Sequence, residues 1–321
     1  MIPNTEIKAS LTSEFRLEQA MKKVGVEDAA LVRKLNIAGT MTEADCRYIR
    51  EKMGKTLQEL DLSEASFEDN KIPYDAFAYC AITSVTIPAS VIEIGEYAFL
   101  ECLKLTSITA HPENPAYASI KGILFNKDMT CLIHCPYSKQ GDCFIPASLT
   151  GYEFLMYINE ECPGLTSITV HPDNPEFASE NGVLFSKNKK RLISCPAGRK
   201  GDYVIPDTTV EIGNLAFYGC TGLTSITIPD TVVAIGRGAF HGCVDLESVT
   251  IPNSVKTIGY GAFSGCYGLS SVIMPDSGVK MGENVFSGCI RLDKLLKHYQ
   301  DTTPPTISII SNTNSTFNLT Y

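Results

Sequence analysis

The residue types best suited to chemistry gather in the segment CLIHCPYSKQGDC, residues 131–143, which holds three cysteines and one histidine. Thiolate and imidazole groups are the ligands of structural zinc sites, so by residue type this segment could bind zinc. A second copy of the segment occupies residues 191–203, and its four equivalent places hold Arg191, Ser194, Cys195 and Tyr203. Because only one possible ligand survives there while the surrounding sequence is retained, we expect no metal ion and no other cofactor.

Two of these cysteines, Cys131 and Cys143, change together between the copies, to Arg191 and Tyr203. A paired change indicates that the two positions touch, as they would across a hairpin. A disulfide could form in the first copy, and an Arg–aromatic stack would replace it in the second. The sequence leaves open whether the disulfide forms.

No catalytic grouping emerges from the spacing of the remaining polar residues. Glycoside hydrolysis needs a pair of carboxylates, and acyl transfer needs a Ser–His–Asp or Cys–His arrangement. His111 and His171 stand in the Pro-bounded segments HPENP and HPDNP, where we expect them to shape the loops. His241 takes a variable place that is serine in the next two repeats, so we expect it to be exposed. We predict no catalytic residues and no enzymatic activity.

Most of the twelve cysteines are not explained by metal binding or by a disulfide, because seven of them occupy the same position in a repeated sequence segment. A free cysteine behaves as a small hydrophobe and is among the most buried residue types. We therefore predict buried thiols that serve packing at Cys80, Cys102, Cys162, Cys220, Cys243, Cys266 and Cys289.

This segment recurs every 23 residues in the last third of the chain. Four ladders keep this step in register: Ile205, Ile228, Ile251 and Met274 before proline; Gly213, Gly236, Gly259 and Gly282; Phe217, Phe240, Phe263 and Phe286; and the cysteines from Cys220 to Cys289. A period of 20 to 29 residues with a short apolar strand per repeat is typical of leucine-rich-repeat solenoids. No single repeat can bury its own apolar face, so stacking completes the core.

Each repeat predicts one short strand and one turn. Leu223, Ile226 and Ile228 form the pattern LxxIxI, which points inward from a strand that Pro229 ends because it lacks an N–H. We expect Gly236 to permit a turn, and the segment RGAFHGC to form one helical or 3₁₀ turn closed by Gly242 in the left-handed conformation. The inward Phe column should be the spine of the core.

The array continues upstream in altered form. VRKLNIAGT (32–40) and LQELDLSEA (57–65) keep the strand, while Thr42 and Asp45 make a capping box that begins the helix EADCRYIREKM. A longer unit of 42 residues is stated twice, at 105–146 and 165–206, and extends the rung with a hairpin-like return. We predict an N-terminal helical cap with two atypical repeats at 1–79, the main repeats at 80–300, and a linker or cap at 301–321.

Charge and hydropathy exclude two classes of partner. The net charge of −9 and the pI near 5.1 give no basic field for nucleic acid. No apolar run reaches the roughly 18 residues that a membrane span requires. The opening residues MIPNTEIKAS also lack the layout of a signal peptide.

The repeat LxxIxIPxxVxxIGxxAFxxCxxL and the long unit with HPxNP and GvLFxK resemble the BspA-like leucine-rich repeats of bacterial cell-surface proteins over about residues 30–297. The stretch 147–162 departs from the pattern, because its Gly and Ala-Phe places are missing. The resemblance implies an α/β repeat fold, a right-handed solenoid with short parallel strands on the concave face and short helical or 3₁₀ turns on the convex side. It also implies a secreted or surface-attached protein used for adhesion or recognition, some relatives of which bind host matrix proteins.

In an LxxIxI strand the third and fifth residues point away from the core, toward the concave sheet. These candidate binding residues are Ser84, Thr86, Ser107, Thr109, Ser167, Thr169, Ser225, Thr227, Ser248, Thr250, Ser271 and Ile273. The hydroxyls either solvate a β surface or offer hydrogen bonds to an extended partner. We favour a non-enzymatic protein that binds a protein partner, such as a host matrix or surface protein, through this face. A glycan-binding role is the alternative, weakened by the lack of Trp and the inward Phe.

Overall fold

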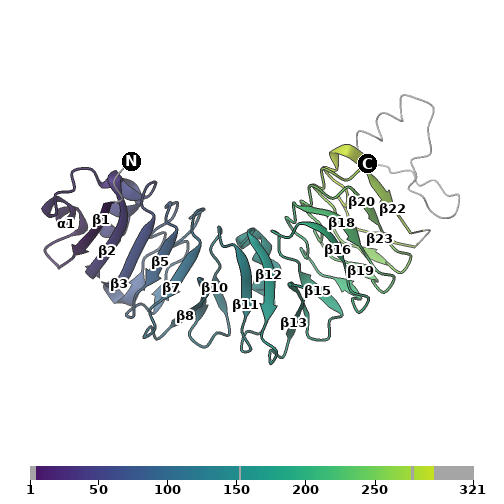
Figure 1. The fold of residues 1–321 in the computed structure, drawn as a ribbon, viewed down its shortest axis with the longest axis horizontal. Coiled ribbons are helices and arrows are strands. Elements are labelled where there is room, and N and C mark those ends of the chain that lie inside the picture. The colour runs from purple at the N-terminus through teal and green to yellow at the C-terminus, as the bar shows by residue number, and fades with distance from the viewer. Residues whose placement is uncertain (1–4, 152, 276–277, 293–321) are drawn as a thin grey trace. The chain divides into compact units, whose positions relative to one another are not determined.

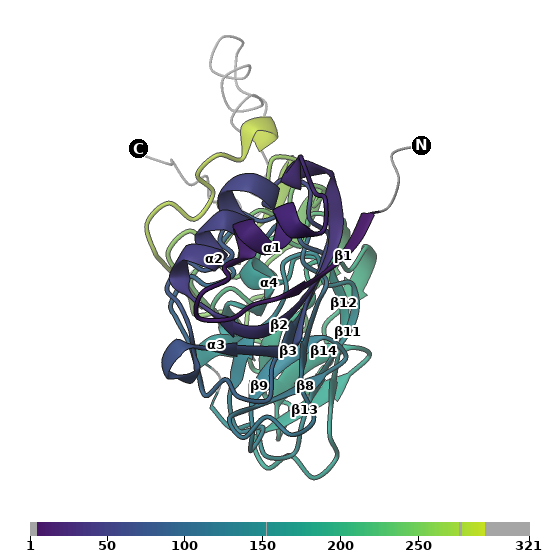
Figure 2. The same cartoon turned by 90° about the vertical axis from the view of Figure 1, so that its left-hand side faces the viewer.

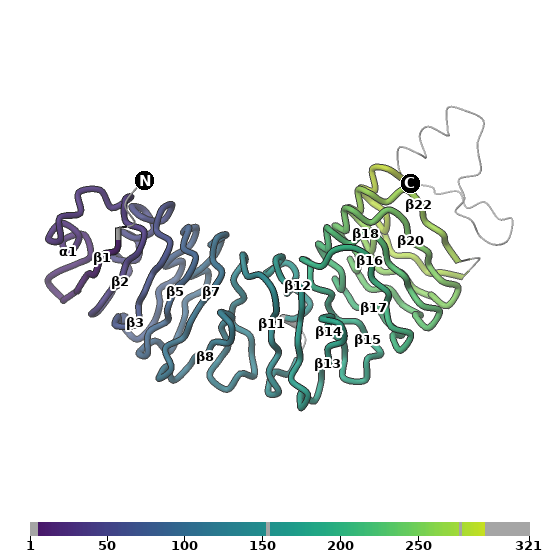
Figure 3. The backbone as a smooth tube through the Cα atoms, viewed as in Figure 1, coloured from purple at the N-terminus to yellow at the C-terminus, as the bar shows by residue number. Residues whose placement is uncertain are grey.

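The computed structural model describes residues 5–151, 153–275 and 278–292 (Figure 1). The chain divides into two compact units, Met1–Lys139 and Gln140–Tyr321, which we call unit 1 and unit 2. Each unit is a stack of rungs with parallel strands and few helices (Figure 3). The segment 301–321 lies outside the described residues, and the division between residues 79 and 80 stays a prediction.

Unit 1 is built on one parallel sheet in the order β1-β2-β3-β5-β7. A second parallel pair, β4-β6, lies on another side of the rungs, and an antiparallel sheet β10-β9-β8 follows. The strands are β1 (Thr5–Ser10), β2 (Val32–Met41), β3 (Glu59–Phe67), β4 (Lys71–Ile72), β5 (Ser84–Ile87), β6 (Glu93–Ile94), β7 (Ser107–Ala110), β8 (Tyr117–Ile120), β9 (Ile123–Asn126) and β10 (Leu132–His134). The helical segments are α1 (Leu17–Lys23), η1 (Ala29–Leu31), α2 (Glu43–Tyr48), the π-helical turn η2 (Ile49–Met53) and η3 (Glu68–Asn70).

Unit 2 has two strands in most rungs. The strands of the LxxIxI pattern form the parallel pairs β11-β12, β16-β18 and β20-β22, while β15-β17-β19-β21-β23 make a second parallel sheet that β14 and β13 extend in antiparallel fashion. The strands of unit 2 are β11 (Gly141–Ile145), β12 (Leu165–Val170), β13 (Phe177–Glu180), β14 (Val183–Ser186), β15 (Arg191–Ser194), β16 (Gly201–Val204), β17 (Glu211–Ile212), β18 (Leu223–Thr227), β19 (Ala234–Ile235), β20 (Ser248–Thr250), β21 (Thr257–Ile258), β22 (Ser271–Ile273) and β23 (Lys280–Met281). Two short helices, α3 (Glu153–Met156) and α4 (Ile158–Glu161), lie where the repeat pattern lapses.

The second sheet was not predicted. It comes from two-residue strands such as Ala234–Ile235, which pair with Thr257–Ile258 in the next rung. A two-residue strand carries too little alternation to be told from a turn in the sequence. The hairpin of the long unit begins at Tyr117 in unit 1 and at Phe177 in unit 2.

The Phe column is the spine of unit 2, as the sequence predicts. Ring centroids lie 4.8 Å apart for Phe217 and Phe240, 4.9 Å for Phe240 and Phe263, and 5.5 Å for Phe263 and Phe286, and all three pairs are stacked. Phe217, Phe240 and Phe263 are fully buried, while Phe286 is partly buried. A shorter column in unit 1 stacks Phe77 on Phe99 at 5.9 Å.

The sequence predicts one helical or 3₁₀ turn for each AFxxC segment, but the structure shows hydrogen-bonded turns there. Gly242 has the predicted left-handed conformation, with φ of 73°, but Gly238 has it as well, with φ of 56°. Because residues with positive φ alternate with others in the turn, every second N–H points to the next rung. The N–H of Phe240, for example, donates to the Ala262 oxygen of the next rung at 2.7 Å. These segments therefore bind rung to rung, which an isolated helical turn could not do.

Gly236 and Gly259 are required for close approach, whereas we expected a permissive turn. Neither has a positive φ. A Cβ on Gly236 would lie 2.6 Å from the Asn214 nitrogen, and one on Gly259 would lie 2.5 Å from the Arg237 nitrogen. The column of glycines thus lets successive rungs pack backbone against backbone.

Six of the seven cysteines in the repeat place are buried thiols, as predicted. Most donate to a carbonyl oxygen of an earlier rung: Cys243 Sγ lies 3.2 Å from the Phe217 oxygen and Cys266 Sγ 3.1 Å from the Phe240 oxygen. Burial raises the pKa of Cys80 to about 12 and that of Cys102 to about 11, so neither forms a thiolate readily. The prediction was wrong for Cys162, which is disulfide-bonded.

Thiol reactivity checks this assignment. Of the ten thiols that the described residues hold, Cys131 alone is exposed. Because the thiolate is the reactive form and needs access, a disulfide reagent added to the native protein should label Cys131 quickly and the others only after unfolding. Replacing Cys131 by serine should remove the fast phase. Rapid labelling of several thiols in the native protein would contradict buried packing thiols.

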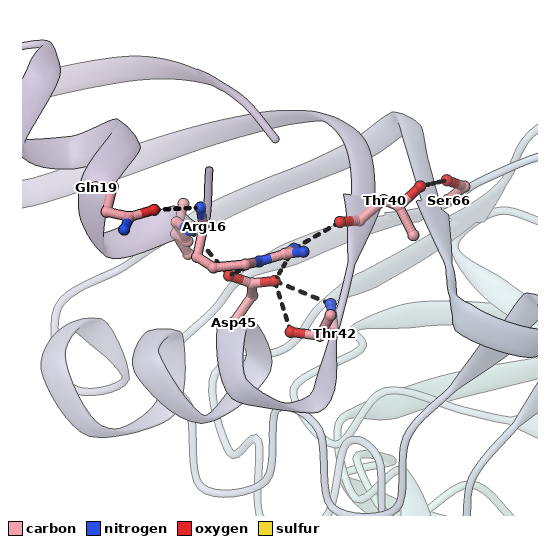
Figure 4. Close-up of polar contacts among 7 residues, drawn as sticks. Arg16, Gln19, Thr40, Thr42, Asp45 and Ser66 are labelled. Carbon is pink, nitrogen blue, oxygen red and sulfur yellow. Dashed lines mark hydrogen bonds and ion pairs between the residues drawn. The ribbon is translucent and has the colours of Figure 1, made fainter. Parts of the chain in front are cut away.

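The carboxylate of Asp45 contacts the N-terminal ends of both α-helices of unit 1, α1 and α2. α1 and α2 pack against each other at the N-terminal end of the unit (Figure 2). Asp45 Oδ2 accepts from the backbone N–H and the hydroxyl of Thr42, each at 2.9 Å, which confirms the predicted capping box. Its Oδ1 also accepts from the Leu17 N–H at 2.9 Å, and the Arg16 guanidinium forms an ion pair with it (Figure 4). Asp45 therefore caps α2 and fixes the start of α1.

Candidate functional site

The outward residues of the LxxIxI strands form two rows on each unit. In unit 1 the register places Lys34 beside Glu59, Glu59 beside Ser84, and Ser84 beside Ser107. The second row runs in the same way through Asn36, Asp61, Thr86 and Thr109. We call these two rows the outer rows of unit 1. The predicted hydroxyls therefore lie side by side on the face that the pattern assigns them.

The N-terminal part of the outer rows of unit 1 is charged, which sequence reasoning missed. Lys34 Nζ lies 2.8 Å from Glu59 Oε2, and the hydrogen bond to Glu59 raises the pKa of Lys34. The Asn36 amide donates to Glu6 Oε1 at 2.9 Å. The signal was present, because the third and fifth places of VRKLNI and LQELDL are the same outward places that hold Ser and Thr downstream.

Unit 2 carries the more exposed outer rows. Asp202 pairs with Ser225 and Val204 with Thr227, while Ser248 pairs with Ser271 and Thr250 with Ile273. Ser225, Thr227, Ser248, Thr250 and Ser271 are exposed, and Ile273 is half-buried. The side chain of Val204 is 66% exposed, so this face presents apolar groups as well as hydroxyls. Val204 was missed because GDYVIP does not show the full LxxIxI pattern.

Two of the predicted residues are partly covered by the hairpins of the long units. The Ile108 N–H donates to the Gly122 oxygen at 2.9 Å, which brings the hairpin turn against Ser107. The same contact recurs at Ser167, where the Ile168 N–H donates to Gly182 at 2.8 Å. Ser107 and Ser167 are consequently half-buried, whereas Thr109 and Thr169 are exposed. Thr169 also donates to Asp142 at 2.7 Å.

The histidines of the HPxNP segments shape loops, as predicted. His111 Nδ1 accepts from the Glu113 N–H and His171 Nδ1 from the Asp173 N–H, each at 3.2 Å. The asparagine of the motif, which the sequence did not single out, holds the loop in place. Asn114 is buried, donates to the Pro88 and Val91 oxygens at 2.7 and 2.8 Å, and accepts from the Ala116 and Tyr117 N–H groups.

The segment 131–143 shows neither the zinc site nor the Cys131–Cys143 disulfide that were considered for it, although its Cys135 is disulfide-bonded. Cys131 carries an exposed thiol and Cys143 a buried one, so the disulfide between them does not form. His134 packs against the Phe99 ring at 6.0 Å, and burial lowers its pKa to about 4. In the second copy, the guanidinium over the Tyr203 ring belongs to Arg199, at 4.7 Å, while Arg191 forms an ion pair with Glu211. Across the described ranges, no three His, Cys, Asp or Glu side chains gather as metal ligands would.

No helix in the described part of the chain has the length and apolar character to cross a membrane. The outer rows of the two units carry side chains that can donate and accept hydrogen bonds and make apolar contacts.

Two solved structures of leucine-rich repeat proteins match the chain, and the first of them supports the fold. A leucine-rich repeat protein from Eubacterium ventriosum matches with a TM-score of 0.55 and 24% identity, over 79% of this chain and 70% of that one. A leucine-rich cell surface protein from Faecalibacterium prausnitzii is 23% identical over 84% of this chain and 73% of its own, with a TM-score of 0.47. No curated protein matches the chain.

The repeats themselves decide the family. The model of the BspA type leucine-rich repeat region matches six copies, over residues 70–137 and 201–312, which is more than half of the sequence. The same residues supply the stacked Phe rings, the close-packed glycines and the thiols of the turns described above. The chain belongs to the family of BspA-type leucine-rich repeat proteins.

Proposed function

We propose that this chain is a non-enzymatic recognition or adhesion module that works outside the cell or at its surface. Family membership supports a recognition role, and the matching F. prausnitzii structure is named as a cell surface protein. The partner is a protein, held through the outer rows and the loops beside them. No catalytic residue takes part in this function.

The observation that carries this proposal is the exposed pair of outer rows in unit 2. Hydroxyls at one-rung spacing suit an extended polypeptide, whose amide groups also repeat along the chain. Val204 and Ile273 supply apolar contacts in the same row as Thr227 and Thr250. Apolar anchors next to hydrogen-bonding groups are what a protein interface needs in order to bind with specificity.

Blocking the outer rows tests the proposal. We expect the purified chain to bind at least one immobilised matrix protein among collagen, fibronectin, laminin and fibrinogen, measured by surface plasmon resonance. The double substitution Ser248→Tyr with Thr250→Tyr should abolish that binding, because two bulky rings would hold an extended partner off the sheet. The fold should survive, since both side chains point to solvent and tyrosine is favoured in strands.

A matched control places the same two rings elsewhere on unit 2. Thr257 and Lys280 are exposed and pair with each other on the second sheet, so Thr257→Tyr with Lys280→Tyr should bind as the native chain does. Equal binding by the native chain and the Ser248/Thr250 variant would refute the assignment of the partner to this face.

A further inference from the structure

A hollow on the turn side of unit 2 is distinct from the outer rows. It has a volume of 340 Å³, at the lower end of the range of about 300–1,000 Å³ that small-molecule sites occupy. Its lining comes from the AFxxC turns of four successive rungs: Leu215, Tyr218, Arg237, Gly238, His241, Tyr260, Gly261, Ser264, Asn284 and Ser287. Sequence reasoning did not find it.

Two successive rungs of the hollow carry glycine at equivalent places. Leu215, Gly238, Gly261 and Asn284 are successive members of one column, so two glycines stand between a leucine and an asparagine. A Cβ on Gly238 would lie 2.8 Å from Leu215 Cδ2, so the leucine side chain packs over this glycine. Both glycines have positive φ, at 56° and 59°, so the turns themselves favour glycine there. Both glycines are buried, so the floor of the hollow is close-packed rather than exposed backbone.

One wall of the hollow is a stack of two aromatic rings, those of Tyr218 and His241. Tyr218, His241, Ser264 and Ser287 are successive members of the neighbouring column. The Tyr218 and His241 rings stack at 5.3 Å and 12° between their planes. The next member is a serine, so the stack ends at His241 and the hollow begins beyond it. A flat ring placed there would take the position that a third aromatic side chain would fill.

The opposite wall is Tyr260, whose ring is held from two sides. The Arg237 guanidinium lies 5.4 Å from its centroid, and the Asn284 amide donates to its hydroxyl at 3.1 Å. The Tyr260 side chain is nonetheless 47% exposed. An aromatic surface fixed in this way costs little conformational entropy when a ligand covers it.

We propose that this hollow binds one sugar ring of a glycan. The C–H face of a pyranose packs on aromatic rings, and its hydroxyls both donate and accept, as do Ser264, Ser287 and the Asn284 amide at the rim. An aromatic side chain of a protein partner would fit the rings but would leave these polar groups without hydrogen bonds, which is unfavourable in a covered site. The site is separate from the outer rows, so it stands apart from the protein-binding function proposed above.

A glycan array carrying mucin-type, N-linked and plant cell-wall oligosaccharides provides the probe, with calorimetric titration of the strongest ligand. We expect saturable binding by the full chain. Ser264→Tyr should weaken it by about tenfold or more, because the new ring would stack on His241 and fill the hollow. This variant should fold, since the same place already holds Tyr218 two rungs earlier.

Tyr260→Ala should likewise weaken binding by about tenfold or more through loss of the second wall. Tyr267→Ala is the matched control, because Tyr267 is 53% exposed but does not line the hollow, and it should leave affinity unchanged. Binding that persists in Ser264→Tyr, or no glycan binding with a Kd below about 10 mM, would overturn the proposal. The Ser248/Thr250 variant should keep the glycan and lose the protein, so failure of one site is distinguishable from failure of the other.

Discussion

Replacing Phe240 by alanine should lower the free energy of unfolding of unit 2 by about 3–5 kcal/mol, the cost of a lost transfer free energy plus the cavity left behind. Phe240 is fully buried and stacks on both Phe217 and Phe263, so the rings on either side would each lose a neighbour. Urea denaturation followed by far-UV circular dichroism measures the change.

Phe286→Ala is the matched control for this substitution. Phe286 is the last ring of the described column, is only partly buried, and has one stacked neighbour at 5.5 Å. Its loss should therefore shift the urea midpoint less than the loss of Phe240. Equal shifts for the two variants would show that the Phe column does not hold the rungs together.

Replacing Asp45 by alanine should destabilise unit 1 by about 3 kcal/mol, because it leaves the Arg16 charge and two backbone N–H groups without their acceptor. Burial, the largest single influence, raises the pKa of Asp45, but the N–H groups of Leu17 and Thr42, together with Arg16, outweigh it and hold the pKa below its ordinary value. Its stabilising contribution is thus complete above the ordinary carboxyl pKa of about 4 and is lost as pH falls through the lower folded-state value.

Urea denaturation between pH 7 and pH 3 tests both parts of this prediction. Asp45→Asn should be less stable than the native chain at pH 7 and should lose less stability on acidification. Glu43→Gln is the control, since Glu43 is in the same helix but pairs with Arg47 at the surface, where an ion pair is worth little. An acid response in Asp45→Asn as steep as in the native chain would contradict the role of this carboxylate.

What could be predicted from the sequence is what recurs at a fixed step. The stacked Phe rings and most of the buried thiols each keep one place in the 23-residue repeats, and the outward Ser and Thr keep two, so successive repeats predict the same environment independently. The ion pair of Arg16 and Asp45 was out of reach because its partners occur once and lie 29 residues apart. The second sheet was missed because four of its strands, β17, β19, β21 and β23, are only two residues long.

The hollow could not be predicted for a different reason. It is lined by residues from four successive rungs, and their grouping can be seen only when the columns of the stacked turns are known. Those columns follow from turns that bind rung to rung, whereas the helical turn expected from AFxxC would have spread the same residues around an axis. The charged outer rows of unit 1, by contrast, were within reach of the rule already applied to Ser and Thr.

The hydrogen bonds between successive turns have a consequence for how such a chain can change in length. Each turn in unit 2 offers carbonyl acceptors to the rung before it and N–H donors to the rung after it, at the same places every time. A duplicated stretch of 23 codons would therefore insert a rung that both neighbours accept unaltered. A duplication that ends part-way through a repeat would put donors opposite donors, so growth by whole repeats is the route that this backbone leaves open.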